Sequence, residues 1–416
     1  MKNYFEQAYE ILSEVYGGAF LKIAMQRLPE DAENRSLVTL LCYGTIENDA
    51  RYHAEITRLT DKKPLKKHVR LILKMAMYLL EGVRRPAYAT VDTAVEFSKK
   101  IDRGASAGLI NAVLRRFLRE GMEIPLPEKR YERIAVQSGF PLFAVKRLFH
   151  TYGEDAEGIF SRRPPVTSVR FPAGEDGAAY FKNAGVNYTP SPFPNLFFAE
   201  NFRRNADFDA GKYTFQSVGS VAICDMISPC EKLLDVCAAP GGKSVLLSEK
   251  CAFVTAGELH PQRVKLIESY AARMRRDNVF AVEKDATLPR EEWNCAFDGV
   301  LCDVPCSGYG VISENPDILL RAGERDFASL PPLQLKILLA SAEFVKPGGC
   351  LYYSTCTLFS EENDGVVSAF LKTRPDFFAE VVTSPLGGRK MKYGLQFLPQ
   401  NAFNAGFYFA KFKKKG

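Results

Sequence analysis

The chain has 416 residues, more than one compact core normally holds, so two or three domains are expected. Hydrophobic residues make up 46% and charged residues 25%, which excludes a disordered or fibrous chain. The net charge of +6 permits nucleic-acid binding without requiring it.

The cysteines and the N-terminus indicate the compartment. The ten cysteines include no C-x-x-C pair, which argues against a zinc ribbon, and no metal is expected. Residues Met1 to Glu6 lack the apolar stretch of a signal peptide, and no apolar run reaches membrane-spanning length. We therefore expect a cytoplasmic protein with reduced thiols and no membrane partner.

Residues 1–125 show helical periodicity. The run Val69 to Leu80 is nearly all apolar, as expected of a central helix in a bundle. Apolar residues at helical spacing predict further helices around Ala8–Val15, Leu37–Ile46, Val91–Phe97 and Gly108–Leu118.

Basic residues accompany these helices, either as a solvated face or as phosphate contacts. They are Lys62, Lys63, Lys66, Lys67, Arg84, Arg85, Arg115, Arg116 and Arg119.

Three segments of this region carry a family resemblance. They read N-R-S-L-V-T-L-L-C-Y-G-T-I-E-N from Asn34, P-L-K-K-H-V-R-L-I-L-K-M-A-M-Y-L-L from Pro64, and A-G-L-I-N-A-V-L-R-R-F-L from Ala107. They resemble segments of NusB-like RNA-binding domains. The resemblance implies that residues 1–125 form an all-α NusB-like bundle that binds RNA.

Two shorter regions follow. The Pro-containing stretch Ile124 to Glu128 marks a boundary, and residues 126–164 are predicted to form a helical linker. Residues 165–225 are predicted to form a small α/β insert, with a strand at Val166–Phe171 and a helix at Ala178–Lys182.

Residues 226–416 alternate strands with helices, which predicts a mostly parallel, doubly wound α/β domain of Rossmann-like type. Ligands of such sheets collect at the carboxyl ends of the strands. The predicted strands are Leu233–Val236, Phe253–Gly257, Val279–Lys284, Gly299–Asp303, Cys350–Ser354, Phe377–Val382 and Phe407–Phe412.

The first of these strands leads into a glycine-rich turn. The segment reads L-L-D-V-C-A-A-P-G-G-K-S from Leu233, and its glycines let the backbone come close to a ligand. Glu258 ends the next apolar run, where an acid contacts a ribose in nucleotide-binding units. An ordinary strand–helix–strand crossover would give the same pattern without a ligand.

Two cysteines lie just beyond predicted strand ends. Cys306 follows Asp303 in D-V-P-C-S, and Cys356 lies in Y-S-T-C-T. If the two strands are adjacent and parallel, both thiols enter one cleft. Most single cysteines are buried as small hydrophobic residues, and this is expected of Cys237, Cys251, Cys295, Cys302 and Cys350.

The chemistry that would use such cysteines is attack on a pyrimidine, which demands one nucleophilic cysteine, a carboxyl group at the base edge and a methyl donor opposite C5. Cytosine C5 is a poor nucleophile, but a thiolate that adds to C6 makes C5 reactive toward a methyl cation from a sulfonium donor. A carboxyl group at the base edge stabilises the charge in the ring, and a base then removes the C5 proton.

The motifs D-V-C-A-A-P-G-G-K-S, D-V-P-C-S and Y-S-T-C-T, followed by E-E-N at Glu361, resemble those of RNA (cytosine-5) methyltransferases. With the NusB-like front end, the chain is similar to the Sun/Fmu/RsmB type over nearly its whole length. This implies a class I S-adenosylmethionine-dependent methyltransferase domain over residues 226–416. It also implies a monomer that forms 5-methylcytosine in small-subunit (16S) ribosomal RNA.

The resemblance also implies roles for single residues. Cys356 would be the nucleophile, Cys306 would help to release the product, and Asp303 would contact the cytosine edge and the cofactor site. Glu258 would hold the ribose of S-adenosylmethionine, and Asp285 the adenine side. The turn would line the same site with Ala238, Ala239, Pro240, Gly241, Gly242 and Lys243.

The chain departs from the family pattern at three places. Glu258 stands where Asp is common, and Phe171 and Pro172 replace the end of a V-R-x-N segment of the RNA-binding insert. Asn404-Ala405-Gly406-Phe407-Tyr408 lacks the acid of the usual C-terminal pattern, which has an Asp-Gly-Phe-Phe.

Three alternatives remain open from the sequence. The substrate could be transfer RNA or another nucleic acid, the enzyme could methylate a protein or a small molecule, or the chain could be a non-catalytic RNA-binding protein.

Overall fold

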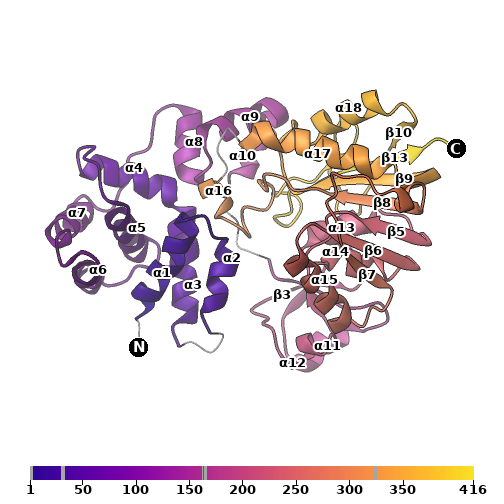
Figure 1. Cartoon of the computed structure of the whole chain (residues 1–416). Coiled ribbons are helices and arrows are strands. Elements are labelled where there is room, and N and C mark those ends of the chain that lie inside the picture. The colour runs from indigo at the N-terminus through magenta and orange to yellow at the C-terminus, as the bar shows by residue number, and fades with distance from the viewer. Residues whose placement is uncertain (1–2, 30–32, 162, 164–165, 322–325) are drawn as a thin grey trace. The chain divides into compact units, whose positions relative to one another are not determined.

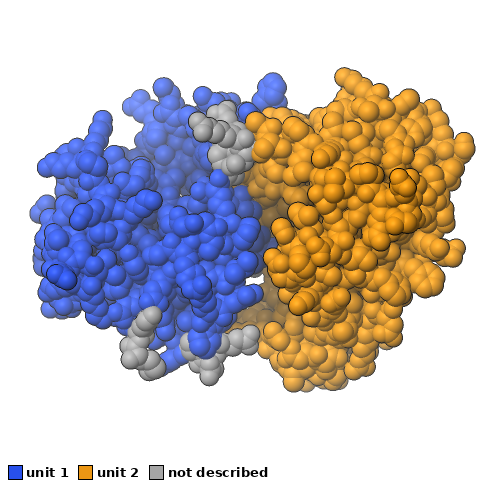
Figure 2. All heavy atoms as spheres, viewed as in Figure 1, with its two compact units in different colours: residues 1–162, 314–322 blue, residues 163–313, 323–416 orange. Residues whose placement is uncertain are grey.

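The computed structural model describes residues 3–29, 33–161, 163, 166–321 and 326–416. The chain forms two compact units, one of residues 1–162 and 314–322 and one of residues 163–313 and 323–416 (Figure 2). The first unit contains the predicted NusB-like region, and the second contains both the insert and the methyltransferase-like region. The predicted boundary between residues 164 and 165 lies outside the described residues.

The first unit is helical, as the sequence predicts (Figure 1). The predicted linker is helical too, and the segment after the Cys306 loop adds one helix to this unit. The helices are α1 (Tyr4–Tyr16), α2 (Leu21–Ala24), the 3-10 helix η1 (Met25–Arg27), α3 (Arg35–Glu47), α4 (Asp49–Leu59), α5 (Lys67–Glu81), α6 (Ala87–Asp102), α7 (Ala107–Arg119), α8 (Arg130–Ser138), α9 (Leu142–Tyr152), η2 (Gly153–Asp155), α10 (Ala156–Ile159) and α16 (Ile318–Arg321).

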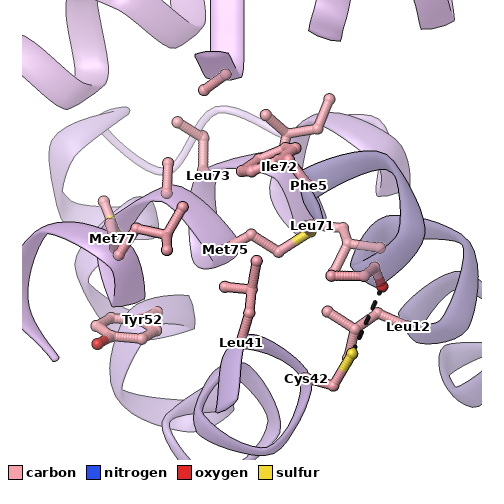
Figure 3. Packing of buried hydrophobic residues seen from close by; sticks show 14 of the residues in the cluster. Phe5, Leu12, Leu41, Cys42, Tyr52, Leu71, Ile72, Leu73, Met75 and Met77 are labelled. Carbon is pink, nitrogen blue, oxygen red and sulfur yellow. Dashed lines mark hydrogen bonds between the residues drawn. The ribbon is translucent and has the colours of Figure 1, made fainter. Parts of the chain in front are cut away.

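Helix α5 is the centre of this bundle, which confirms the prediction from its apolar run. Leu71, Ile72, Leu73, Met75 and Met77 of α5 are buried in one cluster with side chains of α1, α3 and α4 (Figure 3). Each such side chain contributes about 1.5–3 kcal/mol of burial free energy.

The predicted basic residues of this unit are mostly exposed. Lys62, Lys63, Lys66, Lys67, Arg84, Arg85, Arg115 and Arg119 are exposed, whereas Arg116 is half-buried and ion-paired with Glu120.

The predicted insert forms a small antiparallel sheet in the order β2-β3-β1-β4. Its elements are β1 (Ser168–Arg170), α11 (Gly177–Ala184), β2 (Tyr188–Pro190), β3 (Leu196–Ala199), α12 (Ala206–Asp209) and β4 (Thr214–Phe215). Arg170 is buried; its guanidinium donates to Gln216 and forms an ion pair with Glu249 at 2.7 Å. This arginine therefore stabilises the fold and does not face solvent.

A nine-stranded sheet dominates the second unit, with strand order β11-β12-β13-β9-β8-β5-β6-β7 and β10 paired to β13. Five strands, β5 to β9, run parallel to one another. Strand β13 pairs antiparallel with β9, and β10, β11 and β12 also pair antiparallel with their neighbours. The strands are β5 (Lys232–Asp235), β6 (Phe253–Glu258), β7 (Val279–Glu283), β8 (Phe297–Asp303), β9 (Val345–Thr355), β10 (Phe377–Glu380), β11 (Arg389–Lys390), β12 (Leu395–Gln396) and β13 (Tyr408–Lys414).

Helices connect the parallel strands of this sheet, as a Rossmann-like fold requires (Figure 1). They are α14 (Gly242–Leu247), α15 (Pro261–Arg273), the 3-10 helix η3 (Glu291–Trp293) and α17 (Asp326–Ala342), whereas α13 (Val218–Asp225) precedes β5 and α18 (Asp364–Thr373) follows β9. In the described part of the chain, no helix combines the length and the apolar character needed to cross a bilayer.

Candidate active site

The carboxyl ends of β5, β6, β7, β8 and β9 meet at one edge of the sheet, where the second unit has a cavity of about 550 Å³. Both candidate cysteines, Cys306 and Cys356, line this cavity together with Asp303. Glu258 and Asp285, predicted on the cofactor side, line it as well. The cavity thus joins the residues that the sequence places at separate strand ends.

The glycine-rich turn borders the cavity with only part of its length. Gly241 has a φ of 105°, and a Cβ there would lie 3.2 Å from the Cα of Ile267, so only glycine fits without strain. Ala239 lines the cavity. The other predicted residues of the turn, Ala238, Pro240, Gly241, Gly242 and Lys243, are not among the lining residues of the described chain.

Glu258 ends β6 and is buried. Its Oε1 accepts hydrogen bonds from the His260 backbone N–H at 3.2 Å and from the Arg263 guanidinium at 3.3 Å. These donors hold a carboxylate at the second strand end, where the sequence predicts an acid.

Asp285 follows β7 and is half-buried. Hydrogen bonds from the backbone N–H and the hydroxyl of Thr287, both at 2.8 Å, hold the pKa of Asp285 below its usual value. The carboxylate is therefore ionised and fixed in orientation.

Asp303 ends β8 and pairs in register with Ser354 of β9. The Ser354 hydroxyl donates to Oδ1 at 2.6 Å, and the Lys243 ammonium donates to Oδ2 at 2.6 Å. Burial would lower the pKa of Lys243, but the Asp303 carboxylate outweighs it and holds that pKa above its usual value. Lys243, predicted for the cofactor, thus supplies a fixed positive charge beside Asp303.

A second acid, Asp235, lies at the end of the neighbouring strand β5. Burial raises the pKa of Asp235 to about 7, although Ser244 donates a hydrogen bond to it at 2.7 Å. Asp235 therefore carries less charge than an ordinary carboxylate at neutral pH, and Asp303 is the acid with a cation partner.

The two cysteines meet as the sequence predicts. Because β8 and β9 are adjacent and parallel, the sulfurs of Cys306 and Cys356 lie 3.2 Å apart. The hydrogen bond with Cys356, followed by burial, raises the pKa of the Cys306 thiol well above its usual value. The raised pKa favours the protonated thiol of Cys306, whose sulfur also accepts the Cys356 backbone N–H at 3.2 Å; either thiol can donate in the contact between the two sulfurs.

The other cysteines follow the burial prediction in part. Cys251, Cys302 and Cys350 are buried as expected. Cys237 is only half-buried and lines the cavity, so the prediction of burial is wrong there. It is also wrong for Cys295, which is exposed because it lies in the surface turn after η3.

The C-terminal loop that lacks the expected acid packs on the loop of Cys306. The Gly406 N–H donates to the Gly310 carbonyl at 2.8 Å, and the Gly310 N–H donates to the Cys356 carbonyl at 2.9 Å. Phe407 places its ring 5.7 Å from the Lys243 ammonium. Asn404 of this loop is buried.

Within the described residues, no cluster of three or more His, Cys, Asp or Glu side chains is arranged to hold a metal ion.

Comparisons with known proteins agree with the fold. Residues 226–413 match the model of the 16S rRNA methyltransferase RsmB/F family, and residues 6–119 match the NusB family. A crystal structure titled PH0851 covers 100% of this chain and 99% of its own chain, with a TM-score of 0.84 and 22% identity. The structure of a methyltransferase homologue from Pyrococcus horikoshii covers 68% of this chain and 97% of its own chain, with a TM-score of 0.57 and 24% identity.

Curated relatives match over most of their length. The probable ribosomal RNA small subunit methyltransferase B of Bacillus subtilis is 30% identical over 97% of this chain and 96% of its own length. The ribosomal RNA small subunit methyltransferase B of Xanthomonas campestris is 28% identical over 91% of this chain and 89% of its own length. The chain is therefore an RNA methyltransferase and belongs to the RsmB/F family of 16S rRNA methyltransferases.

Proposed function

We propose that the protein transfers a methyl group from S-adenosylmethionine to C5 of a cytosine in small-subunit ribosomal RNA. The observation that carries this proposal is the contact of Cys306 and Cys356 at 3.2 Å in the cavity that Asp303 also lines. Two thiols and a carboxylate at one point suit covalent activation of a pyrimidine. The names of the curated relatives favour ribosomal RNA over transfer RNA as the substrate.

The cavity suits the methyl donor. Its volume of about 550 Å³ lies within the usual range for a small-molecule site. The buried Glu258 would accept hydrogen bonds from the ribose hydroxyls, and Asp285 would do so from the adenine side. The glycine-rich turn would lie along the donor, which supplies an activated methyl group when it is bound.

Cys356 is the group that we assign to the attack. The Cys356 thiol gives up its proton, its sulfur forms a bond to C6 of the cytosine, and the electron pair of the C5–C6 double bond shifts toward C4 and N3, where N3 takes up a proton to give an enamine. Asp303 accepts a hydrogen bond from the amino group of the base, and the Lys243 ammonium at 2.6 Å from Asp303 balances the charge. C5 then carries the density that accepts the methyl group.

Cys306 is the group that we assign to product release. After methyl transfer, C5 loses its proton to a base, the C5–C6 double bond re-forms, and the bond from C6 to the Cys356 sulfur breaks. Cys306, which keeps its proton, donates a hydrogen bond to the departing sulfur 3.2 Å away. The pair therefore divides the work between a nucleophile and a proton-holding partner.

The exposed lysines of the first unit suit the phosphate backbone of the RNA. Lys62, Lys63, Lys66 and Lys67 are exposed within six residues of chain. Phosphate contacts release counterions, so RNA affinity should fall steeply with salt concentration. An affinity independent of salt would remove these lysines from the RNA interface.

Transfer of a labelled methyl group tests the function. With S-adenosylmethionine carrying the label, we expect it in small-subunit ribosomal RNA, as 5-methylcytosine after nuclease digestion. DNA and protein serve as parallel acceptors. Label in DNA or protein would contradict the proposal, and label in transfer RNA alone would refute ribosomal RNA as the substrate.

Replacing Glu258 with alanine is expected to weaken S-adenosylmethionine binding by about 1.5–3 kcal/mol, because a charge-assisted hydrogen bond to the donor is lost. Isothermal calorimetry measures the change. Glu268→Ala, at an exposed position of α15, is the matched control and should bind S-adenosylmethionine like the unmodified protein. Equal affinity for both variants would remove Glu258 from the cofactor site.

A further inference from the structure

One buried carboxylate contacts the loops of both cysteines. Glu362 follows Cys356 in the turn before α18, and it is 0% exposed. A glutamate is rarely buried unless specific donors satisfy its charge. Those donors therefore indicate what the residue does.

The donors come from the two cysteine loops. The Glu362 Oε2 accepts the Ser307 backbone N–H at 2.9 Å, and its Oε1 accepts the hydroxyls of Ser307 and of Thr357, the latter at 3.0 Å. Ser307 comes directly after Cys306, and Thr357 comes directly after Cys356. A single side chain thus ties together the residues that follow the two thiols.

A hydrogen-bond network that includes this carboxylate reaches the loop of Cys306 from both sides. Gln334 of α17 donates through Nε2 to Glu362 at 2.9 Å and to the carbonyl of Pro305 at 2.9 Å. Pro305 and Ser307 flank Cys306, so both neighbours of that thiol are held by one network.

The loop of Cys356 has further support. The Thr357 carbonyl, directly after Cys356, accepts Nδ2 of Asn363 at 3.2 Å and Nε2 of Gln396 at 3.3 Å, and the residues before Cys356 belong to β9 in the middle of the sheet. Loss of the carboxylate should therefore displace Cys306 more than Cys356.

We propose that Glu362 is a positioning residue that fixes the Cys306 thiol against the sulfur of Cys356. The inference rests on the proposed function, since it concerns the step that we assign to Cys306. A thiol displaced by even about 1 Å no longer donates well to the departing sulfur, and misplacement of that size can cost about 100-fold in rate. Glu362 acts through Cys306 and does not touch the base.

The test compares Glu362→Gln with Glu361→Gln, which makes the same chemical change at the exposed neighbouring residue. The amide of Glu362→Gln has the shape of the carboxylate but replaces one acceptor oxygen by a donor, which faces groups that themselves donate. We expect kcat to fall about 10- to 100-fold. The KM for RNA and the affinity for S-adenosylmethionine should stay within about 2-fold, because neither ligand contacts this residue.

The covalent complex gives a second readout. Glu362→Gln should accumulate protein–RNA adduct on a denaturing gel, as we also expect of Cys306→Ala, in which the product-release step assigned to Cys306 is lost, whereas Glu361→Gln should not. Ser307→Ala keeps the backbone bond to Glu362 and loses one hydroxyl, so it should show the same two changes more weakly. If Glu362→Gln does not fold, Ser307→Ala decides by the same readouts.

The outcomes distinguish failure of the role proposed for Glu362 from failure of the role proposed for Cys306. If Cys306→Ala itself gives no adduct, the role assigned to Cys306 fails. If Cys306→Ala gives the adduct while Glu362→Gln behaves like Glu361→Gln, only the inference is overturned. A loss of cofactor affinity and thermal stability that matches the loss of kcat would show a purely structural role and would overturn it too.

Discussion

Cys356→Ala is expected to abolish methyl transfer, with a loss of roughly 10⁴-fold or more in kcat, because the variant has no group that can activate C5 of the cytosine. Asp303 and Lys243 remain in place but stabilise charge only after a nucleophile has added. Incorporation of labelled methyl groups into small-subunit RNA measures the loss.

The same variant should keep its other properties. The affinity for S-adenosylmethionine should be unchanged, and no covalent RNA complex should form. Cys295→Ala, at the exposed cysteine away from the cavity, should be fully active. Methylation by Cys356→Ala at more than a few per cent of the normal rate would exclude Cys356 as the nucleophile.

Cys306→Ala is expected to trap the reaction after attack. Cys356 can still add to C6 and the methyl group can still be transferred, but the departing sulfur loses the hydrogen-bond donor 3.2 Å away. Turnover should fall about 100-fold or more, since a positioned proton donor or acceptor contributes on that order. A protein–RNA complex that survives denaturing electrophoresis should accumulate in the presence of S-adenosylmethionine.

Two other interpretations predict different gels. If Cys306 were the nucleophile, the complex would accumulate in Cys356→Ala instead. If both thiols only filled space, each variant would lose thermal stability and neither would form a complex. Cys295→Ala, which also lacks one thiol, should show no complex under any of the three interpretations.

The sequence predicted the parts of the site that follow from strand order. Alternating strands and helices imply parallel strands, and the carboxyl ends of parallel strands meet at one edge. This reasoning placed Cys306 and Cys356 together although they are 50 residues apart in sequence, and the structure confirms their contact. It also placed Glu258 at the end of β6, where the structure has it.

Other features could not be predicted from periodicity. The two-residue strands β11 and β12 are too short to show a pattern, and α4 was missed because only a narrow stripe, including Tyr52 and Ile56, is buried. In the sequence, Glu362 is one of two adjacent acids, and glutamates are usually exposed. Its burial depends on donors from loops that are distant in sequence, which periodicity does not reveal. The pairing of Lys243 with Asp303 likewise depends on the tertiary fold.

RNA that carries 5-fluorocytidine at the target position tests the central claim most directly. Fluorine at C5 cannot leave as a proton does, so the adduct persists after methyl transfer in the unmodified protein. Digestion and mass spectrometry then identify the peptide joined to the nucleotide. Attachment at Cys356 is the predicted result, and attachment at Cys306, or no covalent attachment at all, would contradict it.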